Sequence, residues 1–178
     1  MSINLNLDDF KSRVGMGTRP NRYSVSMGIP GASYQLQAEV SALSLPDSNV
    51  PPIGIPFRGR ILKLPGDRRY STWGFTVYDT DPSTSDGGGS GVWRELHEWS
   101  ERINTHVENI TPFNYDNDTA NWSITHYSLN GNSALKKITL HNCWPTNVGP
   151  FELAYGAMDS LSQFSCQVEY EYFTVDNV

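Results

Sequence analysis

Apolar and polar side chains alternate along most of this chain, and this alternation constrains the fold more than any other feature of the sequence. The alternating segments are 23–27, 34–40, 73–77, 122–127 and 163–173. Successive side chains of a β-strand point to opposite faces, so each segment is predicted to be a strand with one face in a core and one in water. The chain is 12% aromatic and 18% charged, which also favours a β-rich protein. The sequence predicts a mainly β fold, an antiparallel β-sandwich or barrel-like structure with one flanking amphipathic α-helix.

A turn signal lies between two of the predicted strands. Asn130 and Gly131 both tolerate positive φ, so the strand at 122–127 is predicted to pair with one at 135–142. After that strand, Trp144 precedes a proline, which lacks the N–H that a sheet ladder needs. The strand is therefore predicted to end there, with Trp144 fixed at a corner.

The last alternating segment, 163–173, is predicted to be one long strand. Phe164 and Tyr172 belong to its apolar face, whereas Glu169 and Glu171 belong to its acidic face. Such a strand is typical of a sheet that packs on one side and meets water on the other.

The chain is predicted to be a single domain over 1–178, because no internal repeat or linker interrupts it. Apolar residues at helical spacing predict one helix at 91–108. An N-terminal arm with a short helix is expected at 1–18, and an extended loop or arm at 46–69. Three prolines between 50 and 56 exclude an interior strand there.

The formal net charge of −6 excludes an overall basic nucleic-acid-binding domain, but it is distributed unevenly. Basic residues crowd the segment 58–69, whereas no Lys or Arg follows Cys143. These opposite charges either neutralise each other within one fold or meet between subunits. No apolar stretch approaches the ~20 residues of a membrane helix, so no membrane insertion by this chain is expected. The N-terminus does not resemble a secretory signal, and the two cysteines are expected to be reduced thiols.

No combination of residues predicts a catalytic, metal or cofactor site, so we expect a protein that is not an enzyme. The four histidines are scattered, and Cys143 near His141 has no second pair to complete a zinc site. The glycine-rich loop at 87–91 has acidic neighbours and no Lys or Arg, which makes it a poor anion site.

Three segments, in this order, resemble the tail tube protein family of contractile-tailed bacteriophages, typified by the T-even-like phages. They are Arg19-Pro-Asn21, then Pro65-Gly-Asp-Arg68 with Trp73-Gly-Phe-Thr-Val77 shortly after, and then Trp144-Pro-Thr-Asn-Val-Gly149. Together with the final strand, the resemblance extends from about Asp8 to Phe173. The glycine-rich loop at 86–91 and the Asn-rich segment at 109–121 depart from the family pattern.

The resemblance implies a structural virion protein that assembles into stacked hexameric rings. The rings would form a hollow tube that conducts DNA inside a contractile sheath. The implied partners are further copies of the chain, the tail sheath protein, the baseplate and tail terminator proteins, and DNA in transient, non-specific passage. The implied location is the virion tail, after assembly in the host cytoplasm.

Several residues are candidates for these roles. The candidate subunit-interface residues are Arg58, Arg60, Asp67, Arg68, Trp144 and Asn147. The candidate lumen-facing residues are Glu39, Glu169 and Glu171, because an acidic wall would repel DNA phosphates. Two alternatives stay open, namely that these glutamates face the sheath or bulk water, and that Asp67 holds a turn within one chain.

Other functions also remain open at this level. A β-sandwich binding module could recognise carbohydrate through exposed Trp and Tyr without polymerising. On the same tube fold, the chain could be a minor tube initiator or terminator, or the tube protein of a bacteriocin.

Overall fold

A computed structural model describes residues 6–15, 17–32, 35–36, 39–79, 91–131, 133–150 and 152–176. The glycine-rich loop at 86–91 therefore lies outside the described residues, except for Gly91. The helices are α1 (Leu7–Val14), α2 (Val92–Ile103) and α3 (Tyr115–Asp118). The strands are β1 (Tyr23–Gly28), β2 (Gln35–Leu36), β3 (Val40–Leu43), β4 (Ser48–Asn49), β5 (Pro52–Phe57), β6 (Arg60–Pro65), β7 (Arg69–Tyr70), β8 (Trp73–Tyr78), β9 (Ala120–Tyr127), β10 (Ala134–Val148), β11 (Gln163–Glu169) and β12 (Tyr172–Asp176).

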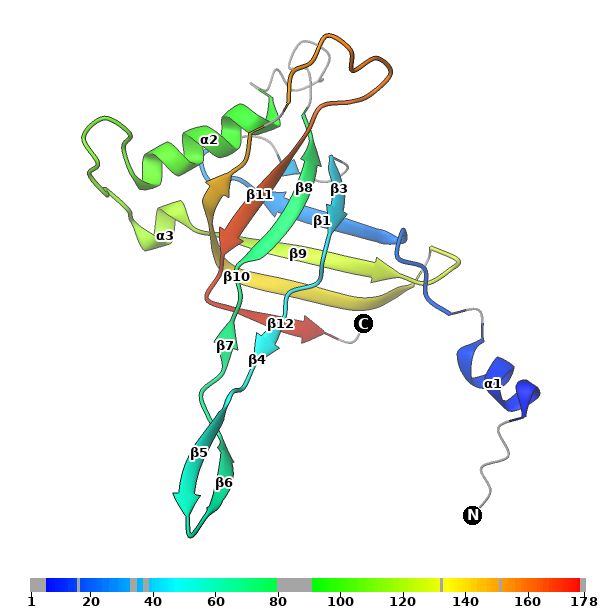
Figure 1. Ribbon diagram of the computed structural model, residues 1–178. Coiled ribbons are helices and arrows are strands. Elements are labelled where there is room, and N and C mark those ends of the chain that lie inside the picture. The colour runs from blue at the N-terminus through cyan, green and yellow to red at the C-terminus, as the bar shows by residue number, and fades with distance from the viewer. Residues whose placement is uncertain are drawn as a thin grey trace.

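Eight strands form one antiparallel sheet that folds back on itself into two layers. Their order is β2-β1-β9-β10-β11-β8-β3, with β12 also paired to β10. In Figure 1 the strands β1, β9 and the first part of β10 run across β8, β11 and β3. This mainly antiparallel β-sandwich confirms the fold class expected from the alternation.

The strand β10 belongs to both layers and joins them. Its first part pairs with β9 and β12, and its last residues pair with β11. Across the bend, His141 opposes Tyr172 and Trp144 opposes Glu169, so β11 and β12 together follow β10 in one continuous register. Strands that bend in this way make the corners of sandwiches whose layers cross.

Two of our strand predictions are wrong at this corner. The segment 163–173 is two strands, and Tyr172 is exposed and stacks on His141 at 4.4 Å between ring centroids. The predicted end at Trp144 is also wrong, because β10 continues to Val148. A proline is tolerated here because β9 begins at Ala120, opposite Cys143, and no longer pairs with β10 at Pro145.

The core lies between the layers and is rich in aromatic rings. Trp122 is fully buried, and its ring centroid lies 5.6 Å from that of Phe75 and 6.3 Å from that of Trp73. Most of the residues that alternation assigned to the inner faces of β1, β8 and β9 are buried, namely Val25, Met27, Trp73, Phe75, Val77, Trp122 and Ile124, whereas Tyr23 and His126 are only half-buried. The hairpin predicted at Asn130-Gly131 is also confirmed by the pairing of β9 with β10.

The helix α2 covers this core with one face. Leu96 and Trp99 are fully buried, and the Trp99 ring lies 5.8 Å from that of Trp122. The helix ends at Ile103, earlier than the predicted 108, because Asn104 takes an extended conformation. Val107 lies beyond this end and is 94% exposed.

Three segments project from the sandwich, as Figure 1 shows. The segment predicted as an arm at 46–69 is a long β-hairpin in which β5 pairs with β6, and β4 pairs with β7 at its root. The Tyr70 ring anchors the root, lying 5.8 Å from Tyr170 and 5.7 Å from Phe173. The other two projections are the loop at 150–162, of which residue 151 lies outside the described residues, and the N-terminal helix α1.

Candidate functional site

The hairpin β5–β6 presents an uncovered apolar face. Every residue of both strands is exposed to solvent. Ile53 opposes Leu64 and Ile55 opposes Leu62, so these four side chains share one face of the hairpin. An isolated two-stranded hairpin is marginally stable in water, so a face of this kind is typical of a surface that is covered in an assembly.

The candidate interface cations lie along this hairpin. Arg58 and Gly59 form its tip, both with positive φ (45° and 79°), as a tight hairpin turn requires. The Arg58 guanidinium lies 5.4 Å from the centroid of the Phe57 ring. Arg60 is the first residue of β6. Arg68, at the root of the hairpin, donates a hydrogen bond to Ser48 Oγ over 2.7 Å.

Among the described residues, Asp67 holds no turn through an ion pair. In the part of the chain that the structure describes, the ion pairs are Arg94–Glu98 and Lys11–Asp8. The charged groups that the sequence placed in this segment are therefore brought close along the chain but not paired within it.

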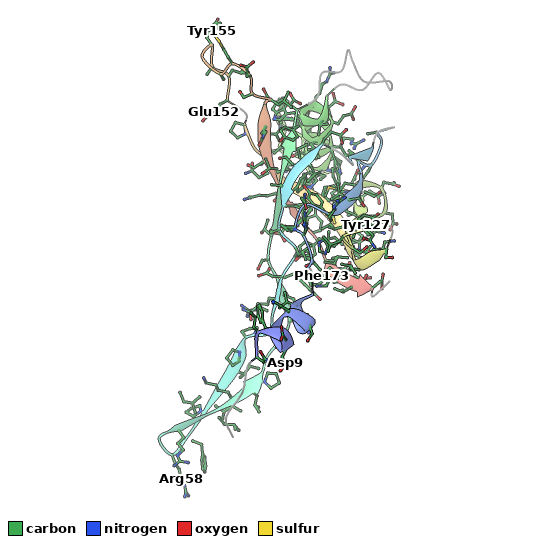
Figure 2. The ribbon with its side chains drawn as sticks, turned by 90° about the vertical axis from the view of Figure 1, so that its right-hand side faces the viewer. Asp9, Arg58, Tyr127, Glu152, Tyr155 and Phe173 are labelled. Atoms are coloured by element: carbon green, nitrogen blue, oxygen red, sulfur yellow. The ribbon has the colours of Figure 1, made fainter. Side chains whose placement is uncertain are left out.

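The loop at 150–162 forms the opposite end of the molecule. Figure 2 shows Tyr155 at one extremity and Arg58 at the other. Leu153, Met158 and Leu161 are also largely exposed in this loop. Its charged side chains are Glu152 and Asp159. Our sequence reasoning missed this surface; large apolar residues in a segment with no strand or helix periodicity were the available signal.

The candidate lumen residues lie on the layer formed by β3, β8 and β11 and at the bend that follows β11. Glu169 ends β11 on the outward face that also bears Ser165 and Gln167, and its carboxylate accepts a hydrogen bond from Thr72 Oγ1. Glu39 precedes β3, and its carbonyl accepts the Tyr78 amide over 2.8 Å. These positions share the layer built from β3, β8 and β11.

Glu171 occupies the bend between β11 and β12. Its Oε2 accepts hydrogen bonds from Asn142 Nδ2 at 2.6 Å and from Tyr115 Oη at 2.8 Å. These two donors, Asn142 first, hold the pKa of the Glu171 carboxyl below its ordinary value. The same bond to Glu171 raises the pKa of the Tyr115 hydroxyl.

Trp144 and Asn147 both lie in the part of β10 that pairs with β11. The half-buried Trp144 ring contacts the Phe113 ring at 6.3 Å between centroids, and Asn147 is exposed beside a β-bulge. None of the five tryptophans is exposed, so the aromatic side chains exposed for a carbohydrate-binding module would be tyrosines such as Tyr155.

The fold brings together two histidines, one on α2 and one in the loop that follows it. The rings of His97 on α2 and His106 in the following loop are 5.0 Å apart, because the chain reverses after Ile103. Across the described ranges, no three His, Cys, Asp or Glu side chains are grouped so that they could hold a metal ion. Cys143 and Cys166 are buried, and burial raises the pKa of each thiol to about 12.

Membrane crossing by a helix finds no support in the described residues, since none of their helices is both long and apolar enough to span a bilayer.

Comparisons with known proteins identify the family. No family model matches the chain. The tail tube protein of Serratia phage KSP90 is 30% identical over 165 residues, which cover 89% of each chain. The tail tube protein gp19 of Enterobacteria phage T4 is 23% identical over 158 residues, which cover 87% of this chain and 90% of gp19.

Solved structures share the fold. A chain of the sheath-tube complex of an extracellular contractile injection system (PVC) matches with a TM-score of 0.60 at 15% identity, covering 94% of this chain and 97% of that one. A chain of the anti-feeding prophage baseplate matches with a TM-score of 0.62 at 10% identity, covering 88% and 93%. The relatives identified by sequence are structural proteins of phage tails. The chain therefore belongs to the tail tube protein family of contractile-tailed bacteriophages and is a structural component of the virion tail, not an enzyme.

Proposed function

We propose that this chain, as a single domain over 1–178, is a subunit of the tail tube that assembles into stacked hexameric rings inside a contractile sheath and conducts DNA. The observation that carries the proposal is the pair of uncovered apolar projections at opposite ends of the molecule (Figure 2). Related folds occur in a sheath-tube complex, in a six-fold symmetrised baseplate and in a tube-terminating cap, which supports sheath, baseplate and terminator partners.

The two projections are complementary in charge. The hairpin end carries Arg58, Arg60, Lys63 and Arg68 around one acid, Asp67. The loop at 150–162 carries Glu152 and Asp159 and no Lys or Arg. A contact between two different surfaces of the same molecule does not close on itself, so it can repeat along an axis. We place the candidate interface residues of the hairpin in this contact between successive rings, and Trp144 and Asn147 at the sheet edge in contacts between neighbouring subunits.

The layer built from β3, β8 and β11 is our candidate for the lumen wall. Its outward positions are Gly74, Thr76 and Tyr78 on β8 and Gln163, Ser165, Gln167 and Glu169 on β11, and Glu169 is the charged group among them. Glu39 and Glu171 lie at the ends of this layer. Protein–DNA attraction depends on the phosphates that Lys and Arg neutralise, so a wall with carboxylates and no cations would let DNA slide.

Electron microscopy of the purified protein tests the proposal. We expect rings or tubes with six-fold symmetry, whereas particles that stay monomeric at all concentrations would contradict it. A matched pair of hairpin variants tests the contact surface. Ile55→Ser removes an apolar side chain from the face shared with Ile53, Leu62 and Leu64, and Ile61→Ser makes the same change on the opposite face.

We expect the Ile55 variant to form far fewer tubes and the Ile61 variant to assemble normally. Both side chains are exposed in the isolated chain, so neither change removes a core contact. Equal assembly by both variants would exclude this face of the hairpin from the contact. Arg58→Glu at the tip of the hairpin tests the role of charge. Unchanged assembly of this variant would exclude the Arg58 guanidinium from the contact between rings.

A further inference from the structure

We propose that helix α1 of one subunit packs into an apolar pocket beside β1 of an adjacent subunit. The proposal rests on the proposed self-assembly of this chain and adds a specific contact to it. It follows from two surfaces of the same chain that are each incomplete, an uncovered amphipathic helix and an open apolar pocket at the base of that helix.

The helix has an apolar stripe that nothing in the described chain covers. Leu7, Phe10 and Val14 are spaced three and four residues apart on one face, and they are 62%, 56% and 50% exposed. Figure 1 shows α1 standing away from both layers of the sandwich. A helix of eight residues is marginal in water by itself, and helices of this length are normally stabilised by packing of their apolar face.

The pocket lies where the N-terminal segment joins the sandwich. It has a volume of about 330 Å³, and Pro20, Tyr23, Leu43 and Leu45 contribute to its wall. The Tyr23 hydroxyl donates to the Val40 carbonyl over 3.0 Å. The polar end of this side chain is thus satisfied, and its ring is left to line an apolar surface.

The first turn of the helix is complementary in charge to the rim of the pocket. Asp8 and Asp9 lie in this turn, whereas Lys11 and Arg13 follow in the second turn, and Lys11 Nζ lies 4.0 Å from Asp8 Oδ1. Lys136 and His126 border the pocket, and the His126 ring is hydrogen-bonded to the Arg19 carbonyl at 2.9 Å. A helix seated with its first turn at this rim would bring the Asp9 carboxylate towards Lys136, which favours that orientation of α1 in the pocket.

The connection between helix and pocket leaves α1 away from its own sandwich, as Figure 1 shows. Gly15 and Gly17, which precede Thr18 at the pocket, both have positive φ, 54° and 65°. A helix held away from its own pocket can fill the equivalent pocket of a neighbour. Repeated around a ring, this exchange covers every helix and every pocket.

Disulfide trapping between subunits tests this directly. Phe10→Cys and Leu45→Cys are made in separate preparations, mixed before assembly and oxidised. The native thiols of Cys143 and Cys166 are buried and do not compete. We expect a cross-linked dimer on a non-reducing gel from the mixture and much less from Phe10→Cys mixed with Thr174→Cys, an exposed position outside the pocket.

The double variant, Phe10→Cys with Leu45→Cys in one chain, shows whether the helix in each pocket comes from the same subunit or from a neighbour. A ladder of multimers supports exchange, whereas a fast-migrating monomer with no dimer in the mixed sample would show that α1 fills its own pocket and would overturn the proposal. As a second readout, Phe10→Ala should raise the protein concentration needed for assembly about tenfold relative to Lys11→Ala. Equal concentrations for the two variants would also overturn it.

Microscopy of the same samples separates this inference from the proposed function. Tubes that form without any cross-link between Phe10→Cys and Leu45→Cys subunits would reject the helix exchange and leave tube assembly standing. Failure of the native chain to form rings or tubes would reject both.

Discussion

Asn142 donates a hydrogen bond from Nδ2 to the Glu171 carboxylate over 2.6 Å, and this bond joins the two strands at the point where both bend from one layer to the other. Asn142 has a φ of 56°, and the Glu171 amide donates to the His141 carbonyl over 3.0 Å. The inward positions shift at the same place in both strands, from Leu140 to Cys143 in β10 and from Tyr170 to Phe173 across the bend. Each strand thus has an additional residue at the bend, and its apolar side stays in the core.

Glu171→Gln is expected to lower stability at neutral pH, with an effect that disappears in acid. Hydrogen bonds from Asn142 and Tyr115 lower the pKa of Glu171 in the folded protein relative to the unfolded chain. The charged carboxylate therefore stabilises the fold fully above the pKa of the unfolded chain, and this stabilisation is lost as the pH falls through the pKa of the folded protein. Urea unfolding of both proteins across the acid range should show their midpoints converging as the pH falls. Tyr115→Phe removes one of the two hydrogen-bond donors to Glu171, so the stability difference between this variant and its Glu171→Gln derivative should depend less on pH. A constant difference between native protein and Glu171→Gln at every pH would contradict this explanation.

Gly149→Ala is expected to destabilise the fold by about 1–3 kcal/mol, because a Cβ at this position would lie 2.6 Å from the Ser165 carbonyl oxygen. The same two residues are joined by the hydrogen bond from the Gly149 amide to that carbonyl at 2.8 Å. Gly74→Ala is the matched control, since its Cβ would have no neighbour closer than 3.8 Å. Denaturant midpoints should separate the two variants, and similar values would show that β10 and β11 can move apart at no cost.

Trp122→Ala is expected to cost about 3–5 kcal/mol of unfolding free energy. The indole is fully buried between both layers and α2, and its N–H donates to the Gly28 carbonyl over 2.8 Å. Trp144→Ala should cost less, because this ring is only half-buried. Equal losses in a denaturation experiment would mean that the Trp144 corner supports the fold as much as the centre of the core does.

The two thiols are expected to be unreactive in the native protein. Burial makes the thiolate form of Cys143 and Cys166 rare, with a pKa of about 12 for each. Titration with a thiol reagent at pH 8 should detect no thiol before unfolding and both afterwards. Rapid reaction of either thiol in the native state would show that the strands carrying it open locally.

The alternation of apolar and polar residues and the turn signals predicted most strands of the sandwich. Alternation identified the buried residues of β1, β8 and β9 because a strand with one inner face imposes a period of two on its sequence. Asn130-Gly131 identified the hairpin between β9 and β10, and of these two residues Gly131 takes the positive φ, 72°.

The corner could not be predicted in the same way. Alternation continues through Tyr170 and Glu171, so no local signal marks the bend, which depends on how the layers pack. Pro145 would end a strand that had partners on both sides, and it lies within β10 because β9 begins only at Ala120. Four of the candidate interface residues were chosen from charge and the other two from the segment around Pro145. Neither criterion identified the exposed apolar side chains of α1 and of the loop at 150–162.

The opposite placement of hairpin and loop in Figure 2 also bears on how a polymer of this chain would stop growing. If the hairpin of each subunit meets the loop of the next, every added layer renews the same free end, and the filament has a direction. Such a contact is the same at every layer, so it does not depend on how many layers have already been added. Length would have to be measured by another molecule, and each of the two unlike ends would need its own cap.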